Sequence, residues 1–304
     1  MIQKTRGLIA APHTPMNADG SLHLEAIDRQ VDLLARNGVL GAFVCGTTGE
    51  GMSLTTQERM DAAERWVRAA PEDFRVIVHV GHNSPADCRA LAEHARKIGA
   101  FATGAAAPTF YRPASAAELA DFCRNVAGAA PELPFYYYHI PSLTGAHFAM
   151  VDLLAAAADE VPNLAGVKFT HEDLMDYALC RELVGGRLDM LWGRDEILLS
   201  ALAVGAEGAI GTTYCIAAPL YRRIMSAFSA GDLAAARADQ LKAMRMVHVL
   251  RRWGLVVSPT KHVMRMLGVD CGPVRPPLRA LTDEQHERLR ADLERIGFFD
   301  FCCK

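Results

Sequence analysis

Short apolar runs alternate with amphipathic segments over most of the chain. Each run is four to eight residues long, is rich in Val, Ile, Phe, Tyr or Ala, and is bounded by glycine or proline. Short runs of this kind are typical of strands that are buried on both faces of a parallel sheet. Eight strands are therefore predicted, beginning near Gly7, Gly41, Arg75, Phe101, Pro134, Leu164, Leu188 and Glu207.

The segments between these runs have the period and the boundary signals of α-helices. In the first segment, one helical face carries Leu24, Ile27, Val31 and Leu34, and Gly38 is a typical helix stop. A hydroxyl residue three positions before Glu or Gln can form a capping box, and Ser-Pro suits the first turn of a helix. Such starts occur at Thr55–Glu58, Ser84–Pro85, Ser115–Glu118 and Thr282–Gln285, with stops near Gly99 and Gly297.

Strict β–α alternation, eight times over, favours a (β/α)8 TIM barrel. A doubly wound open sheet is the alternative, but no Gly-x-Gly-x-x-Gly follows the first strand. About 80 residues remain after the eighth strand, and their pattern is helical throughout. The prediction is one structural domain, with an α/β barrel over residues 1–225 and a C-terminal helical extension over residues 226–304 packed on it.

Composition excludes several classes of protein. The 304 residues are 51% hydrophobic, and 32 basic against 35 acidic side chains give a net charge of -3. Neither disorder nor a basic surface for nucleic acid or anionic lipid is therefore expected. No apolar stretch approaches the length of about 18 residues that a membrane span needs, and the first residues lack a signal-peptide core. These features predict a cytoplasmic protein without a membrane span.

The eight cysteines indicate reduced thiols rather than a metal site or a disulfide framework. The chain has no Cys-x-x-Cys pair, no spaced histidine triad and no His-Glu-x-x-His, so no metal site is predicted. Most of the cysteines lie in apolar sequence, as buried thiols do. Cys302 and Cys303, at the extreme C-terminus, are instead expected to be exposed.

In a barrel of this kind, functional side chains come from the C-terminal ends of the strands and from the loops after them. The second strand runs into Gly46-Thr47-Thr48-Gly49. Glycine allows a sharp turn, and two hydroxyls with free backbone N–H groups could cradle a carboxylate. A glycine-rich turn without any chemical role is an equal alternative at this point.

The fifth and sixth strands carry candidates for chemistry. Lys168 is the one lysine of six that ends an apolar strand. Burial would lower its pKa and make the amine a nucleophile that can form a Schiff base with a carbonyl, unless the side chain simply snorkels outward. In the fifth strand, alternation places Tyr136 and Tyr138 on one face and Tyr137 on the other. A tyrosine hydroxyl at a strand end can relay a proton, although aromatic residues also favour strands for packing.

The seventh and eighth strands end in further polar residues. Gly193 precedes the adjacent carboxylates of Asp195 and Glu196, which could bind sugar hydroxyls or could complement the dipole of a helix N-terminus. The eighth strand ends at Thr212 and Thr213, which adds two hydroxyls to the same rim.

Together these motifs resemble a known enzyme family. The Gly-Thr-Thr-Gly-Glu turn, Tyr138-x-x-Pro and Gly-x-Lys168-x-Thr, in this order and spacing, are similar to the dihydrodipicolinate synthase / N-acetylneuraminate lyase family of pyruvate-dependent class I aldolases. The resemblance covers essentially the whole chain. Leu143 stands where the dihydrodipicolinate synthases usually carry an arginine, and the segments around Asp195 and Thr212 resemble the lyase branch.

The resemblance implies an activity and its partners. The expected reaction is the reversible cleavage of N-acetylneuraminate to N-acetylmannosamine and pyruvate through a covalent imine, without metal or organic cofactor. An aldolase or dehydratase acting on 2-keto-3-deoxy sugar acids is the alternative, followed by dihydrodipicolinate synthase and by a non-catalytic pyruvate-binding regulatory protein. The implied partners are a keto-acid sugar and pyruvate, without nucleic acid or membrane, and the implied assembly is a homotetramer.

The resemblance also assigns roles to residues. Lys168 would form the imine with the C2 carbonyl, and Tyr138 would position the substrate and shuttle the proton, with Thr47 joining the relay. Thr47 and Thr48 would hold the pyruvyl carboxylate. Tyr111, on the loop after the fourth strand, would reach a neighbouring subunit. The hydroxylated tail of the sugar would be bound by Thr170, Gly193, Asp195, Glu196 and Thr212.

Overall fold

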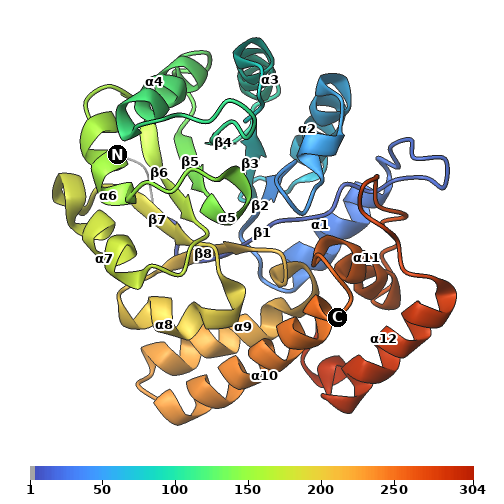
Figure 1. Ribbon diagram of the computed structural model, residues 1–304. Helices are drawn as coiled ribbons and strands as arrows, with labels where there is room; N and C mark the ends of the chain where they lie inside the picture. The colour runs from blue at the N-terminus through green and yellow to red at the C-terminus, as the bar shows by residue number, and fades with distance from the viewer. Residues whose placement is uncertain (1–3) are drawn as a thin grey trace.

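The eight predicted strands close into a parallel barrel. In the computed structural model, which describes residues 4–304, the strands pair in chain order and the eighth pairs with the first (Figure 1). Each strand begins within one residue of its predicted start, which confirms the TIM barrel. The strands are β1 (Gly7–Ala10), β2 (Gly41–Val44), β3 (Arg75–His79), β4 (Ala102–Ala106), β5 (Phe135–His139), β6 (Leu164–Phe169), β7 (Asp189–Trp192) and β8 (Gly208–Gly211).

Helices form the layer outside the barrel, and α10 to α12 extend it along one side (Figure 1). Short 3-10 helices occur at η1 (Gly51–Ser53), η2 (Leu183–Gly186), η3 (Asp195–Ile197) and η4 (Phe298–Asp300). The α-helices are α1 (Ala26–Arg36), α2 (Thr56–Ala69), α3 (Pro85–Lys97), α4 (Ala116–Ala127), α5 (Pro141–Thr144), α6 (Met150–Ala157), α7 (Leu174–Glu182), α8 (Leu198–Ala203), α9 (Tyr214–Ser229), α10 (Leu233–Arg251), α11 (Val257–Met266) and α12 (Asp283–Arg295).

The predicted helix starts are largely confirmed. Thr55 and Thr282 each form a complete capping box with the residue three positions on. The third predicted box is only half formed. Ser115 accepts a hydrogen bond from the backbone of Glu118, but the Glu118 carboxylate accepts from Ala114 N instead of from the cap residue.

Alternation along the strands gives the molecule two apolar layers. One cluster fills the barrel interior and includes Ile9, Phe43 and Leu191, whereas a larger cluster lies between the strands and the surrounding helices. Tyr136 and Tyr138 belong to the interior cluster, and Tyr137 belongs to the outer one, as alternation predicts. Tyr138 therefore lies inside the barrel near the C-terminal end of β5.

The C-terminal segment is not helical throughout, which corrects the prediction. Residues 267–282, between α11 and α12, contain no helix. This stretch is rich in proline and glycine. Proline cannot donate the helical hydrogen bond, and glycine in a helix is about 1 kcal/mol less favourable than alanine. The predicted division after residue 225 falls inside α9 and stays a prediction. Among residues 4–304, no helix is both long enough and apolar enough to cross a membrane.

The expectation that Cys302 and Cys303 are exposed is wrong. Their exposed fractions are 3% and 1%, because the chain after η4 packs against the first turns of α9. Cys303 N donates to Ile216 O over 2.8 Å, at a kink where Ala217 leaves the helical conformation. Lys304 N then donates to Asn37 Oδ1, so the last residues join the end of α1 to the start of α9.

Candidate active site

The turn after β2 is tightly folded. Cys45 and Glu50, which flank its four central residues, adopt left-handed conformations with φ of 56° and 55°. A Cβ atom on Gly51 would lie 1.9 Å from Cys45 O, so only glycine fits where the turn closes on itself. The turn holds Thr47 and Thr48 at the C-terminal end of the barrel, where catalytic groups of such barrels lie.

Lys168 lies near the end of β6 and is only 3% exposed. Its Nζ atom lies 4.2 Å from the ring centroid of Phe43 and 4.0 Å from that of Tyr138. Burial lowers the pKa of this amine to about 7, and the charge of Asp195 only partly opposes the shift. A large fraction of Lys168 is thus neutral at neutral pH, as a nucleophilic amine must be.

Tyr138 pairs in register with Lys168 on the neighbouring strand. Its hydroxyl lies 3.2 Å from Thr47 Oγ1. Burial raises the pKa of Tyr138 to about 12, against the hydrogen bond with Thr47, which lowers it. The phenol is therefore protonated at neutral pH and can donate a proton before it accepts one.

Hydroxyl groups that follow β2, β6 and β8 lie around this pair. Thr48 Oγ1 lies 2.6 Å from Thr212 Oγ1, which joins the turn after β2 to the end of β8. Thr170 Oγ1 is buried without a hydrogen-bond partner in the described part of the chain. A Cβ atom on Gly193 would lie 2.0 Å from Thr170 Oγ1, so glycine is needed there to leave room for this hydroxyl.

The two predicted carboxylates differ in their surroundings. Asp195 Oδ2 accepts from Thr213 N and from the Thr213 hydroxyl over 2.8 and 2.6 Å, whereas Oδ1 is buried without a partner within residues 4–304. Burial raises the pKa of Asp195 to about 6, and the hydrogen bonds from Thr213 oppose this. Glu196 is less buried, and its Oε1 lies 2.5 Å from Arg251 Nη2. Both residues lie in η3, so the helix-start interpretation and the binding interpretation are compatible.

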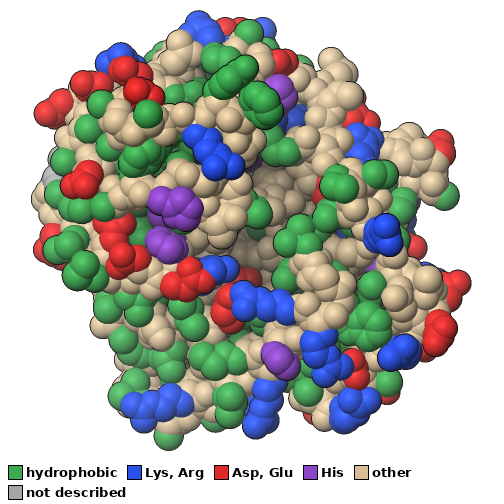
Figure 2. Space-filling model, viewed as in Figure 1, with side chains coloured by type: hydrophobic (Ala, Val, Ile, Leu, Met, Phe, Trp, Pro, Cys, Tyr) green, Lys and Arg blue, Asp and Glu red, His purple; other side chains and the backbone are tan. Residues whose placement is uncertain are grey.

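Nine of the ten predicted site residues line one cavity of about 140 Å³, which opens at the C-terminal ends of the strands. Figure 2 shows a hollow near the middle of this face, with acidic and basic side chains side by side below it. Tyr111 does not line that cavity. It is 86% exposed, and its ring packs edge-on against that of Phe110, at 4.9 Å between centroids.

Three residues around the cavity had no role assigned from the sequence. Phe43 faces the amine of Lys168, and Thr213 holds Asp195. Arg251 comes from α10 and contacts Glu196 across 55 residues of sequence. Alternation along β2 could have placed Phe43 in the barrel, and Thr213 lies in the hydroxyl pair already noted. No local signal could have indicated Arg251.

The described residues show no group of three or more His, Cys, Asp or Glu that could hold a metal ion. A second, largely apolar cavity of about 230 Å³ shares Thr47 and Tyr138 with the first. It is lined by Leu143, which stands where the synthases usually carry an arginine. The chemistry available in the first cavity is therefore that of one amine, one phenol, several hydroxyls, two carboxylates and the guanidinium groups of Arg194 and Arg251.

Known proteins are similar to this chain over nearly its full length. The sequence profile of the dihydrodipicolinate synthetase family matches residues 4–296. The chain is 40% identical over 303 residues to the N-acetylneuraminate lyase of Rattus norvegicus, covering 98% of this chain and 95% of the lyase. The structure of Proteus mirabilis N-acetylneuraminate lyase superposes with a TM-score of 0.95 at 40% identity, covering 97% and 100% of the two chains. A dihydrodipicolinate synthase from Bacillus anthracis gives 0.89 at 26% identity, covering 97% and 99%. The chain therefore belongs to the dihydrodipicolinate synthetase family.

Proposed function

We propose that this protein is a carbon–carbon lyase, a Schiff-base class I aldolase that reversibly cleaves N-acetylneuraminate to N-acetylmannosamine and pyruvate. The observation that carries the proposal is the buried amine of Lys168, with its pKa lowered to about 7, beside the phenol of Tyr138. Full-length similarity to N-acetylneuraminate lyases supports the choice of substrate.

In the proposed reaction, the neutral amine of Lys168 adds to the C2 carbonyl of the open-chain sugar acid. Tyr138 donates its proton to the hydroxyl of this adduct, which leaves as water and gives an iminium and a phenolate. The iminium accepts the electron pair when the C–C bond breaks, which a ketone does poorly at neutral pH. The Tyr138 phenolate then takes up the proton of the hydroxyl that becomes the aldehyde, and Thr47, 3.2 Å away, joins the relay. Protonation and hydrolysis of the resulting enamine then release pyruvate and restore the amine.

The remaining polar groups orient the substrate. Thr47 and Thr48 are proposed to hold the pyruvyl carboxylate through their hydroxyls and the backbone N–H groups of the turn. Fixing both ends of the substrate brings the C2 carbonyl within reach of the amine, and such orientation can supply much of a rate enhancement. The tail of the sugar is proposed to contact the group around the cavity rim, namely Thr170, Gly193, Asp195, Glu196 and Thr212.

Three further features belong to this proposal. The iminium is itself the electron acceptor, so the reaction requires neither a metal nor an organic cofactor. We propose a homotetramer in which Tyr111 contacts a neighbouring subunit, because its ring is almost fully exposed in the single chain. A cytoplasmic location fits the eight free cysteines, since cytosolic thiols are kept reduced.

Borohydride reduction in the presence of pyruvate tests the imine. The expected result is a stable mass increase on the peptide that contains Lys168, and its loss in Lys168→Ala. The exposed Lys242→Ala is the matched control and should keep the adduct. A folded wild-type protein that forms no adduct would refute the aldolase and favour a pyruvate-binding regulatory protein.

Pyruvate release distinguishes the substrates. N-acetylneuraminate and 2-keto-3-deoxygluconate are compared at equal concentrations, with pyruvate measured by a coupled dehydrogenase. Preference for N-acetylneuraminate supports the proposal. An adduct with pyruvate but release only from 2-keto-3-deoxygluconate would assign the site to the other sugar acids, and condensation of pyruvate with aspartate semialdehyde would assign it to the synthases.

A further inference from the structure

A buried ion pair joins the turn after β2 to the C-terminal helices. Lys261 Nζ, from α11, lies 2.8 Å from Glu50 Oε1, and the two side chains are only 2% and 1% exposed. Glu50 is the last residue of the Gly-Thr-Thr-Gly-Glu motif. Neither residue lines the cavity that holds Lys168, although Glu50 borders the adjoining apolar cavity that shares Thr47 and Tyr138 with it.

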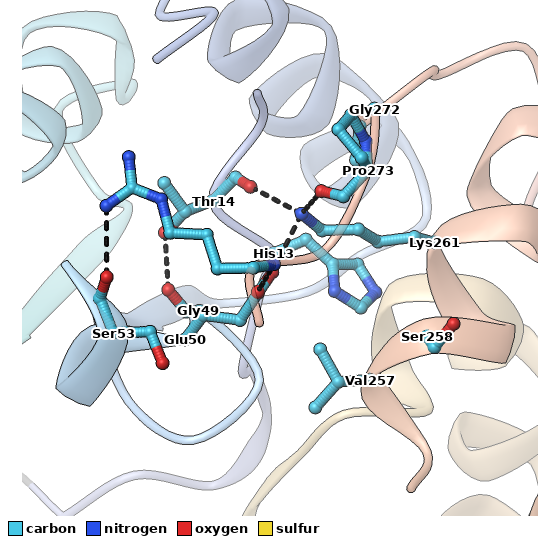
Figure 3. A network of polar contacts seen from close by, with 12 residues as sticks. His13, Thr14, Gly49, Glu50, Ser53, Val257, Ser258, Lys261, Gly272 and Pro273 are labelled. Carbon is cyan, nitrogen blue, oxygen red and sulfur yellow. Dashed lines mark hydrogen bonds and ion pairs between the residues drawn. The ribbon is translucent and has the colours of Figure 1, made fainter. Parts of the chain in front are cut away.

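Both members of the pair make further polar contacts, which Figure 3 shows. The ammonium of Lys261 donates to Thr14 O over 3.0 Å and to Pro273 O over 2.6 Å. Glu50 Oε2 accepts from Arg275 N over 2.7 Å. The pair therefore holds together four segments that are distant in sequence: the loop after β1, the turn after β2, α11, and the irregular segment before α12.

The pair is coupled directly to the proposed carboxylate site. Glu50 N donates to Thr47 O over 3.1 Å, and the Thr14 hydroxyl donates to Gly49 O over 2.7 Å. Glu50 also has the left-handed backbone that the turn requires, at an energetic cost for a residue that is not glycine. A hydrogen bond within the turn and one from the loop after β1 thus fix the backbone on both sides of Thr48.

Stability alone is a poor explanation for this arrangement. Removing two charges from water costs free energy, and a buried ion pair is often no more stabilising than apolar side chains of similar size. What the pair provides is a fixed geometry, because each charged group must meet its partner at one position. The group positioned here is the turn that carries Thr47 and Thr48.

We propose that Glu50 and Lys261 are positioning residues, whose ion pair fixes the Gly46–Gly51 turn so that Thr47 and Thr48 face the amine of Lys168 before the substrate arrives. This inference rests on the proposed function, since it concerns how pyruvate is held. Loss of the pair should weaken pyruvate binding while Lys168 keeps its reactivity, because the amine is carried by another strand.

The test measures borohydride trapping of Lys168 over a range of pyruvate concentrations. In Lys261→Met, the apparent dissociation constant for pyruvate should rise by about tenfold or more, since a misplaced orienting group commonly costs that much. The fraction trapped at saturating pyruvate should stay close to that of the wild type. Trapping with acetone, which has no carboxylate, should be unaffected.

The double variant Glu50→Gln/Lys261→Met separates positioning from stability. It leaves no unpaired buried charge, so its Tm should recover relative to Lys261→Met, whereas its pyruvate affinity should stay low. If the single variant does not fold, the double variant serves alone. Arg252→Met is the matched control, because it breaks the ion pair of Arg252, the C-cap residue of α10, with Asp292 of α12 without touching the turn.

Three outcomes would count against one or the other of the two claims. A wild-type protein without any adduct would refute the proposed function. A normal wild-type adduct, together with unchanged pyruvate affinity in a folded Lys261→Met or double variant, would overturn the positioning role alone. Recovery of pyruvate affinity along with Tm in the double variant would also overturn it, because the pair would then act only through stability.

Discussion

Burial brings the pKa values of Lys168 and Asp195 closer together. It lowers the pKa of Lys168 to about 7 and raises that of Asp195 to about 6. Each shift disfavours the charged form, as transfer out of water does. The aromatic rings of Phe43 and Tyr138 beside the amine keep water away from it while still tolerating its positive charge. The site therefore carries less charge at neutral pH than its side chains suggest.

The lowered pKa of Lys168 predicts a pH dependence for imine formation. The amine is half neutral near pH 7 and about one-tenth neutral one unit below, so the rate of adduct formation should fall as pH drops through 7. It should level off above about pH 8, whereas an ordinary lysine would still gain reactivity up to about pH 10. Initial rates of borohydride trapping at fixed pyruvate, measured from pH 5.5 to about 10, check this.

Tyr138→Phe should separate imine formation from turnover. The ring beside Lys168 is kept and only the hydroxyl is lost, so the pyruvate adduct should still form. Turnover of N-acetylneuraminate should fall by about 10²-fold or more, which is typical for loss of a proton-transfer group. Tyr136→Phe is the matched control. Its hydroxyl donates to Asp189 over 3.1 Å, deeper in the barrel, so its loss should lower stability and leave turnover nearly unchanged. Equal turnover losses in both variants would argue against the relay.

At the scale of helices and strands, the sequence predicts the features that depend on the local pattern of apolar and polar residues. Strand starts and most helix caps follow from apolar runs and short polar signals, and alternation places Tyr138 in the barrel. Lys168 was identifiable because a lysine at the end of an apolar strand needs an explanation. The pairing of Glu50 with Lys261 could not be identified from the sequence, because it depends on how α11 packs against a turn 211 residues away. The burial of Cys303 depends in the same way on a kink in α9.

The junction of β6 and β7 gives a prediction at this scale. Gly193 N donates to Phe169 O over 2.8 Å, which holds the ends of the two strands together and leaves no room for a side chain. In Gly193→Ala, the new methyl group must displace the Thr170 hydroxyl, which it would meet at 2.0 Å, and it also comes within 2.9 Å of Phe169 O. The KM for N-acetylneuraminate should rise by about tenfold or more, while the pyruvate adduct forms normally.

Thr170→Ala is the matched variant for this test, because it removes the hydroxyl that the methyl group would displace. If displacement of Thr170 is the cause, Gly193→Ala/Thr170→Ala should have a KM no higher than Thr170→Ala alone. An additive increase in the double variant would instead indicate that Gly193 acts through the strand junction itself.

At the scale of the whole molecule, one group of exposed apolar side chains lies beside the site. Phe110 and Tyr111 are 77% and 86% exposed, and Leu143 is 49% exposed. The loop after β4 lies against α5, since Thr109 and Leu143 line the same cavity. Adjacent apolar side chains of this size are unusual on the surface of a monomer and are typical of association sites. Because they border the catalytic face, association there would also shield the cavity from one side.

We therefore predict that this patch is buried in the proposed homotetramer. Sedimentation velocity over a range of protein concentrations should show the wild type as a tetramer. The double substitution Phe110→Ser/Tyr111→Ser should yield smaller species, because each exposed ring loses about 1.5–3 kcal/mol of apolar burial. Leu241→Ser, which changes an apolar side chain 47% exposed on α10, is the matched control and should leave the tetramer intact. A monomeric wild type would contradict the assembly, whereas a tetrameric double variant would place the contact on another surface.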